Sequence, residues 1–205
     1  MSAWWVERGD VYALAGTPFA AKLKALVPMR DVRDAAPLVG KLRMKKSAAE
    51  IAAIQHATDV SMKAHLESWK RLQPGNYEYN AVAAFTKSLM DEGCERHAYE
   101  PIFGSGPNSV ILHYDSNRRR MDSGDVIVID AGASCANYTS DITRTLPVAG
   151  KFTERQRQVY EVVLGAQRAA IEAARPGVTP ARLAEIARKY MDDHGGFGKY
   201  LLHGI

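Results

Sequence analysis

Two aspartates, Asp130 and Asp141, are separated by ten residues within an otherwise apolar, strand-like segment, residues 126–148. Suppose that VIVID and SDITRT pair as antiparallel strands joined by AGASCANYT. Opposed residues on one face then have Cβ atoms about 4.5–5.5 Å apart. Two carboxylates that close cannot both stay ionised in a dry site unless a cation compensates them. The spacing therefore predicts a metal site, and a pair of ions about 3.5–4 Å apart suits such carboxylates.

Oxygen ligands favour hard or borderline ions such as manganese, cobalt or zinc over copper or iron–sulfur chemistry. Simpler interpretations of both aspartates remain open at this point. Asp130 can cap the turn that begins at Ala131, and Asp141 can pair with Arg144 or lie at an exposed strand end. Residue spacing alone does not decide between these alternatives.

The segments around the aspartates predict an α+β domain. A capping box, Ser47 to Glu50, begins a helix that ends before Pro74-Gly75, and a second helix over residues 79–92 ends at Gly93. We expect this second helix to bury three residues at helical spacing, Val82, Phe85 and Leu89.

The stretch from residue 98 to residue 147 then changes to short β-like runs, PIFGSGPNSVILHY, DVIVID and DITRTLPV, which predict the sheet. Two more helices follow, one after the capping box that starts at Thr153 and one after Thr179-Pro180. Helices, sheet and helices in this order favour helices packed on an antiparallel sheet.

Composition argues against several classes of protein. The formal net charge is +4, and basic residues cluster only at 118–120 and 41–46, so nucleic acid is not expected as a partner. No apolar run approaches the roughly 20 residues that span a bilayer, and charges near the start do not suit a signal peptide. Cys94 and Cys135 are too few for a disulfide framework and form no CxxC pair. We expect a cytoplasmic protein with no membrane partner.

The pattern D-A-G-x8-D-I-T-R-T-x-P-V-x-G-K-F-T-x-x-Q-R-x-x-Y, from Asp130 to Tyr160, resembles the M24 metallopeptidases. These have the pita-bread fold, and the Xaa-Pro aminopeptidases (aminopeptidase P) are the most similar branch. The likeness extends back through K-S-A-A-E-I and I-L-H-Y, and forward through R-P-G to the closing H-G-I. It covers about residues 42–205.

The resemblance implies a role for four residues. Asp130 matches the ligand that chiefly binds one metal, and Asp141 matches the ligand that bridges both. His113 matches a histidine near the bound substrate, and His203 matches the first histidine of the family's H-G-x-x-H motif. Without this context, a lone histidine beside a strand is more often structural. The implied cofactors are two divalent ions, with manganese expected and cobalt or zinc as alternatives.

The implied activity is metal-dependent hydrolysis of the N-terminal Xaa-Pro bond by a hydroxide that bridges the two ions, acting on peptides with proline in second position. The family's site takes five protein ligands, and three of them have no counterpart before Ile205. We therefore interpret residues 46–205 as the first part of a pita-bread catalytic domain, incomplete in its C-terminal half. Residues 1–45 are interpreted as the end of an N-terminal creatinase-type domain plus a linker.

The 205 residues alone are not expected to sustain a dinuclear site. The alternatives are a non-catalytic pita-bread binding protein and a relative of the creatinase or prolidase type. A homo-oligomer is also expected from the resemblance.

Overall fold

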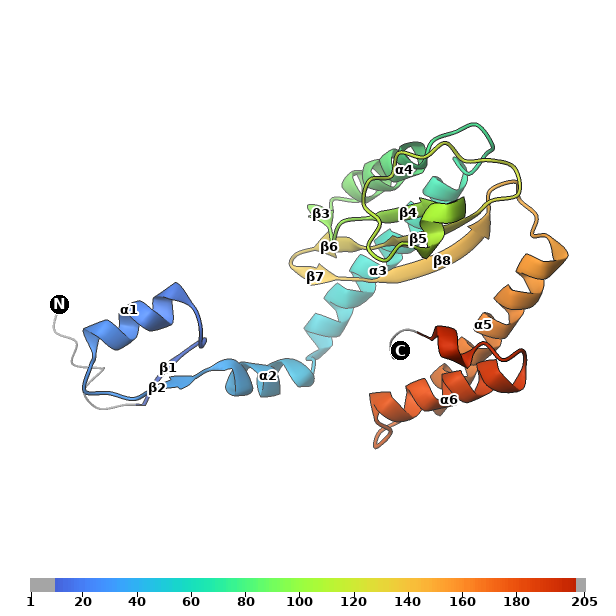
Figure 1. Ribbon diagram of the computed structural model, residues 1–205. Coiled ribbons are helices and arrows are strands. Elements are labelled where there is room, and N and C mark those ends of the chain that lie inside the picture. The colour runs from blue at the N-terminus through green and yellow to red at the C-terminus, as the bar shows by residue number, and fades with distance from the viewer. Residues whose placement is uncertain (1–9, 202–205) are drawn as a thin grey trace. The chain divides into compact units, whose positions relative to one another are not determined.

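The structure is a computed structural model that describes residues 10–201 (Figure 1). Contacts divide the chain into two compact units, with the boundary after Gln55. The predicted division near residue 45 stays a prediction. None of the helices among the described residues is long and apolar enough to cross a membrane.

The first unit contains two short parallel strands, β1 (Val11–Ala13) and β2 (Val32–Asp34), with α1 (Pro18–Leu26) between them and α2 (Ala36–Met44) after them. Thr17 caps α1 by accepting the Ala20 N–H at 3.1 Å, and proline occupies the first turn of this helix.

The long helix α3 (Ala48–Trp69) begins at the predicted capping box. The Ser47 N–H donates to the Glu50 carboxylate at 2.7 Å, and the Glu50 N–H donates to the Ser47 hydroxyl at 3.3 Å. Its buried residues are mostly small or polar: Ala57, Val60, Ser61, Ala64, His65 and Ser68. Two large apolar residues of the same helix, Ile51 and Met62, are exposed. Small side chains on the inner face let the helix backbone approach the sheet closely.

The helix α4 (Glu78–Asp91) confirms the second predicted helix. Phe85 and Leu89 are fully buried as expected, whereas Val82 is only half-buried. Gly93 follows with a φ of 82° that suits a glycine after a helix end. Its first residue, Glu78, is also fully buried.

The predicted strand pair is also present. β4 (Ile102–Ser105), β5 (Val126–Ala131) and β8 (Ile142–Pro147) form one antiparallel sheet with β5 in the centre. A second small sheet joins β3 (Arg96–His97), β6 (Ala133–Cys135) and β7 (Tyr138–Thr139). One expectation was wrong, because residues 106–110 form a short 3₁₀ helix, η2 (Gly106–Val110), and residues 111–113 form an exposed loop.

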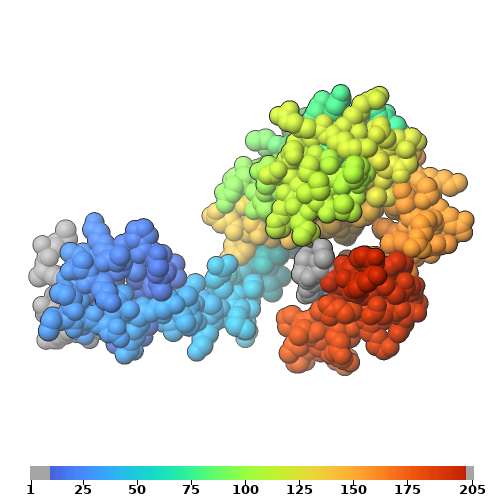
Figure 2. Space-filling view, in the orientation of Figure 1, coloured from blue at the N-terminus to red at the C-terminus, as the bar shows by residue number. Residues whose placement is uncertain are grey.

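Burial alternates along β5, so one face of the strand points into the core and the other carries Asp130. Ile127, Ile129 and Ala131 are buried among residues of α3 and α4, whereas the alternate positions, which end at Asp130, are half-buried. Figure 1 shows α3 and α4 packed beside this sheet, and in Figure 2 the surrounding green and yellow segments pack closely together.

Past the sheet, α5 (Glu154–Ala173) and α6 (Pro180–Asp193) pair with each other around Ala166, Ala170, Ala187 and Met191, and η3 (Gly198–Tyr200) follows. Both predicted caps are confirmed: the Thr153–Gln156 capping box starts α5, and Thr179 caps α6.

Cys94 and Cys135, whose spacing in the sequence did not predict a bond between them, form a disulfide with Cα atoms 4.6 Å apart. This bond ties the end of α4 to the end of β6.

Candidate metal centre

The carboxylates of Asp130 and Asp141 meet at the hydroxyl of Tyr99. This hydroxyl lies 2.5 Å from Asp130 Oδ1 and 3.0 Å from Asp141 Oδ1. Burial, together with the hydrogen bonds and charges of the two aspartates, raises the pKa of Tyr99, so the phenol stays protonated as a donor. The structure thus brings together two of the predicted site residues.

The register differs in one detail from the simplest expectation. Asp130 lies opposite Thr143, and Asp141 lies two residues before Thr143, so the aspartates share a face but sit diagonally rather than directly opposite. Diagonal neighbours are about 7–8 Å apart at their backbones, which carboxylate side chains can bridge towards a common atom. Tyr99 occupies that common position.

The donor set around Tyr99 fits a cation. A phenol carries one proton, which cannot satisfy two carboxylates at once. Arg144, a candidate partner for Asp141, donates instead to the Thr143 carbonyl at 2.8 Å. Asp141 does lie exposed at the start of β8, as one simpler alternative expects, but its carboxylate also converges with that of Asp130. Paired carboxylate oxygens are the ligands that hard divalent ions prefer.

Gly132 allows the backbone near Asp141 to approach the end of β5. A Cβ atom at position 132 would lie 1.9 Å from the Ser140 carbonyl oxygen and 2.7 Å from its carbon, so any larger residue is excluded. This close approach gives the D-A-G pattern a physical reason: Gly132, two residues after Asp130, lets the residue before Asp141 approach it closely.

A short chain of hydrogen bonds fixes the same region to α3. The Ala133 N–H donates to Ser61 Oγ at 2.8 Å, and the Ser61 and Ser140 hydroxyls are 2.6 Å apart. The Ser140 hydroxyl also lies 3.3 Å from the Ala57 carbonyl. The hydroxyls are satisfied in sequence if Ser61 donates to Ser140 and Ser140 donates to Ala57. Both serines are buried, so this chain holds the segment before Asp141 in place.

His65 supports the strand from the core side. Its Nε2 donates to the Ala131 carbonyl at 3.1 Å, and its ring packs edge-on against Phe85. Burial lowers the pKa of His65, which favours the neutral ring with the proton on Nε2. This buried histidine supports the backbone at Ala131, the residue that follows Asp130.

The two predicted histidines are placed differently. His113 is exposed in the loop after η2, with a left-handed φ of 52°. His203 lies outside the described residues. Their predicted roles stay predictions.

The loop that carries His113 is anchored by Glu78. Ser105 donates to Glu78 Oε1 from its N–H at 2.8 Å and from its hydroxyl at 2.7 Å, and Asn108 Nδ2 lies 3.3 Å away. Tyr114 and Arg119 donate to Glu78 Oε2 from a hydroxyl at 2.7 Å and a backbone N–H at 2.9 Å. A buried carboxylate with five donors is a structural anchor.

Sequence reasoning missed both Tyr99 and Glu78. Glu78 had a detectable signal, because it continues the predicted Val82, Phe85 and Leu89 series back by one helical turn, and a charge on an inward face needs partners. Tyr99 had none, since its bond to Asp130 joins residues 31 positions apart.

Comparisons with known proteins agree with this geometry. Residues 52–205 match metallopeptidase family M24. The Xaa-Pro aminopeptidase of Escherichia coli (strain K12) is 38% identical over 146 residues, which cover 71% of this chain and 33% of that protein. The Xaa-Pro dipeptidase of Pyrococcus horikoshii is 33% identical over 187 residues, or 91% of this chain and 53% of that protein.

Among solved structures, proline aminopeptidase P II from Yersinia pestis superposes with a TM-score of 0.85 at 32% identity. The match covers 94% of this chain and 47% of that one. The likeness confirms the α+β pita-bread class over the portion that the chain contains. This chain spans between a third and about a half of the length of these relatives.

Proposed function

Because this chain belongs to metallopeptidase family M24, we propose that the protein is a metal-dependent aminopeptidase that cleaves the N-terminal Xaa-Pro bond of peptides. The observation that carries the proposal is the convergence of Asp130 and Asp141 on one hydroxyl, on one face of the sheet. The kinship with Xaa-Pro aminopeptidases supports the choice of substrate.

Asp130 and Asp141 would hold divalent metal, with manganese expected and cobalt or zinc as alternatives. Two such ions supply, when bound, water activated at neutral pH and polarisation of the scissile carbonyl. Tyr99 orients the two carboxylates through its hydroxyl. His113 and His203 are proposed to contact the peptide and to stabilise the negative charge that develops on its carbonyl oxygen.

A groove between β8 and α5 offers room for a peptide, although neither aspartate lines it. It has a volume of about 620 Å³, and its lining includes Val126, Thr143, Thr145 and Tyr160. One of the lining residues, Thr143, lies opposite Asp130 in the sheet. Its size falls within the roughly 300–1,000 Å³ of small-ligand pockets.

A second candidate, an Xaa-Pro dipeptidase, is favoured by the length of the match to the Pyrococcus horikoshii enzyme. The two activities differ in their substrates. An aminopeptidase cleaves the bond between Xaa and Pro at the N-terminus of longer peptides, whereas a dipeptidase cleaves the same bond in the dipeptide alone. Parallel assays with an Xaa-Pro dipeptide and an Xaa-Pro-Xaa tripeptide separate them. A cytoplasmic location and a homo-oligomeric assembly accompany the proposal.

The test replaces Asp141 by asparagine in the intact protein, because asparagine preserves the shape and removes the charge. The control is Asp91→Asn, at an exposed aspartate of α4 that pairs with Lys87. We expect Asp141→Asn to lose bound manganese and to lower hydrolysis of the tripeptide by at least about 100-fold, the scale of losing a catalytic acid or base. Unchanged metal content and rate in Asp141→Asn would refute the proposal, whereas Asp91→Asn should match the parent.

A further inference from the structure

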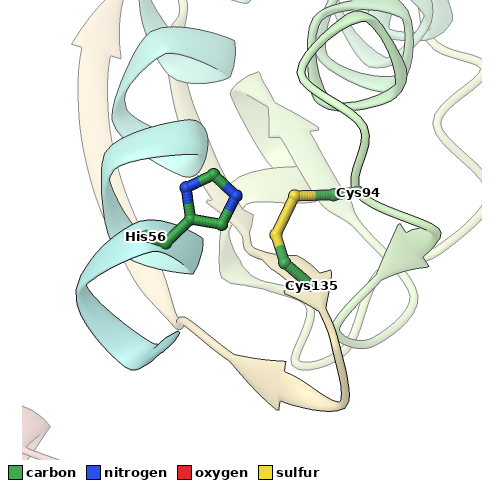
Figure 3. Close-up of side chains that lie close together, drawn as sticks. All are labelled: His56, Cys94 and Cys135. Carbon is green, nitrogen blue, oxygen red and sulfur yellow. A yellow bond between two sulfur atoms is a disulfide. The ribbon is translucent and has the colours of Figure 1, made fainter. Parts of the chain in front are cut away.

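A second group of potential metal ligands lies away from the aspartates. His56, Cys94 and Cys135 place one ligand atom each within 4.8 Å of the others, and Figure 3 shows the imidazole facing the two sulfur atoms. His56 comes from α3, Cys94 follows the end of α4, and Cys135 ends β6. The cysteines are 4% and 5% exposed, whereas His56 is exposed, so an ion can reach the sulfurs from the histidine side.

Backbone contacts independent of the sulfur–sulfur bond hold both cysteines in place. The Cys94 N–H donates to the Leu89 carbonyl at 3.1 Å, which closes the end of α4. Cys135 precedes a two-residue hairpin turn, and the carboxylate of Glu95 accepts the N–H of Ala136 in that turn at 3.1 Å. The residues next to the two cysteines are therefore linked by a second contact. We expect the thiols to remain neighbours when the disulfide is reduced.

We propose that the reduced chain binds zinc through the thiolates of Cys94 and Cys135 and the imidazole of His56, and that formation of the disulfide abolishes this site. Two thiolates and an imidazole are a typical zinc donor set, with Zn–S near 2.3 Å and Zn–N near 2.0–2.1 Å. Solvent fills the fourth position on the open side. The site uses none of the aspartates, and it stands independently of the proposed peptidase activity.

A dithiol reductant converts the disulfide form of the chain into the dithiol form that binds zinc. Two thiols of the reductant give up their protons and two electrons, the Cys94–Cys135 bond breaks, and the reductant leaves as its own disulfide. Each protein thiol then releases its proton as its sulfur binds the metal. A sulfur engaged in a disulfide has no thiolate to donate, so the two states exclude each other.

Soft and borderline ions are the only ones that suit this donor set. Thiolates select zinc or copper(I), whereas manganese and magnesium prefer oxygen. The simpler interpretation is a structural disulfide beside an unrelated surface histidine. That interpretation predicts no metal binding by the reduced protein through His56, which makes the two interpretations separable.

Cobalt(II) is the probe, because a thiolate-bound Co²⁺ gives sulfur-to-metal charge-transfer absorption that a carboxylate site cannot give. The intact protein is titrated with Co²⁺ after reduction with dithiothreitol and removal of the reductant without air, and again in its oxidised form. We expect charge-transfer bands that saturate at one ion per chain only in the reduced sample. Added zinc should remove them.

Three variants make the assignment specific. Cys135→Ser should abolish the bands. His56→Ala should weaken Co²⁺ binding at least about 10-fold, because removing even a residue that only supports a metal ligand lowers metal affinity by about 10- to 100-fold. His194→Ala, at an exposed histidine after α6, should leave binding unchanged. Reduced protein with two reactive thiols but no charge-transfer band would overturn the proposal, as would undiminished binding in His56→Ala.

Discussion

Replacing Glu78 by glutamine should destabilise the protein by about 3 kcal/mol. The carboxylate accepts bonds from Ser105 and Asn108 on one oxygen and from Tyr114 and Arg119 on the other. A glutamine amide turns one of these acceptors into a donor. In its better orientation the NH₂ group faces Tyr114, whose hydroxyl can rotate to accept, and the Arg119 N–H, which cannot.

The magnitude follows from two losses. One buried backbone N–H without a partner costs about 1–3 kcal/mol. The remaining bonds change from charge-assisted to neutral, and neutral bonds are roughly half as strong. Together these losses exceed the effect of removing an exposed carboxylate, which is about 0–1 kcal/mol.

Urea unfolding of Glu78→Gln beside Glu92→Gln provides the assay. Glu92 follows the same helix and forms an ion pair with Lys63 at 2.8 Å near the surface. Hydrogen exchange should also accelerate at the amides of Ser105 and Arg119 in Glu78→Gln alone. If both variants shift the free energy of unfolding equally, by less than about 1 kcal/mol, then the anchor role of Glu78 is wrong.

Two further changes test the surroundings of the aspartates. Gly132→Ala should cost about 3 kcal/mol, the upper end for overpacking, because its Cβ would lie 1.9 Å from the Ser140 carbonyl oxygen. The control is Gly40→Ala in α2, where the added Cβ meets open space and should stabilise the protein by about 0.5–1 kcal/mol. Thermal unfolding measures both variants, and equal shifts in their free energies of unfolding would contradict the close approach at Gly132. Because burial lowers the pKa of His65 below its unfolded value near 6.5, unfolding takes up a proton and stability should fall as the pH drops below about 6.5, by up to about 1.4 kcal/mol per pH unit. His65→Gln, which keeps a donor for the Ala131 carbonyl, should flatten this slope in urea midpoints measured from about pH 5 to 7, and an unchanged slope would contradict the assignment.

Much of the fold was predictable because its signals are local. The capping boxes at Ser47 and Thr153 satisfy N–H groups three residues away, so their sequences suffice to locate the starts of α3 and α5. The pairing of β5 with β8 was predictable for a similar reason, since a short hairpin segment joins them and both strands are rich in β-formers.

Local signals failed where the tertiary environment decides. The apolar run after Asn108 is typical of a strand, yet Val110 is 83% exposed. The loop is held by hydrogen bonds from its neighbours Asn108 and Tyr114 to Glu78. On α3, the residues that are buried are those small enough for close contact with the sheet, not the most hydrophobic ones. Ile51 is therefore exposed and Ser61 is buried.

The sequence by itself indicated that Asp130 and Asp141 lie close together, because both belong to one short hairpin segment. Only the tertiary structure decided what surrounds them. The bond from Tyr99 to Asp130 spans 31 residues, and the disulfide between Cys94 and Cys135 spans 41. Contacts over such separations depend on how the intervening helices and strands pack, and no short-range pattern records that packing.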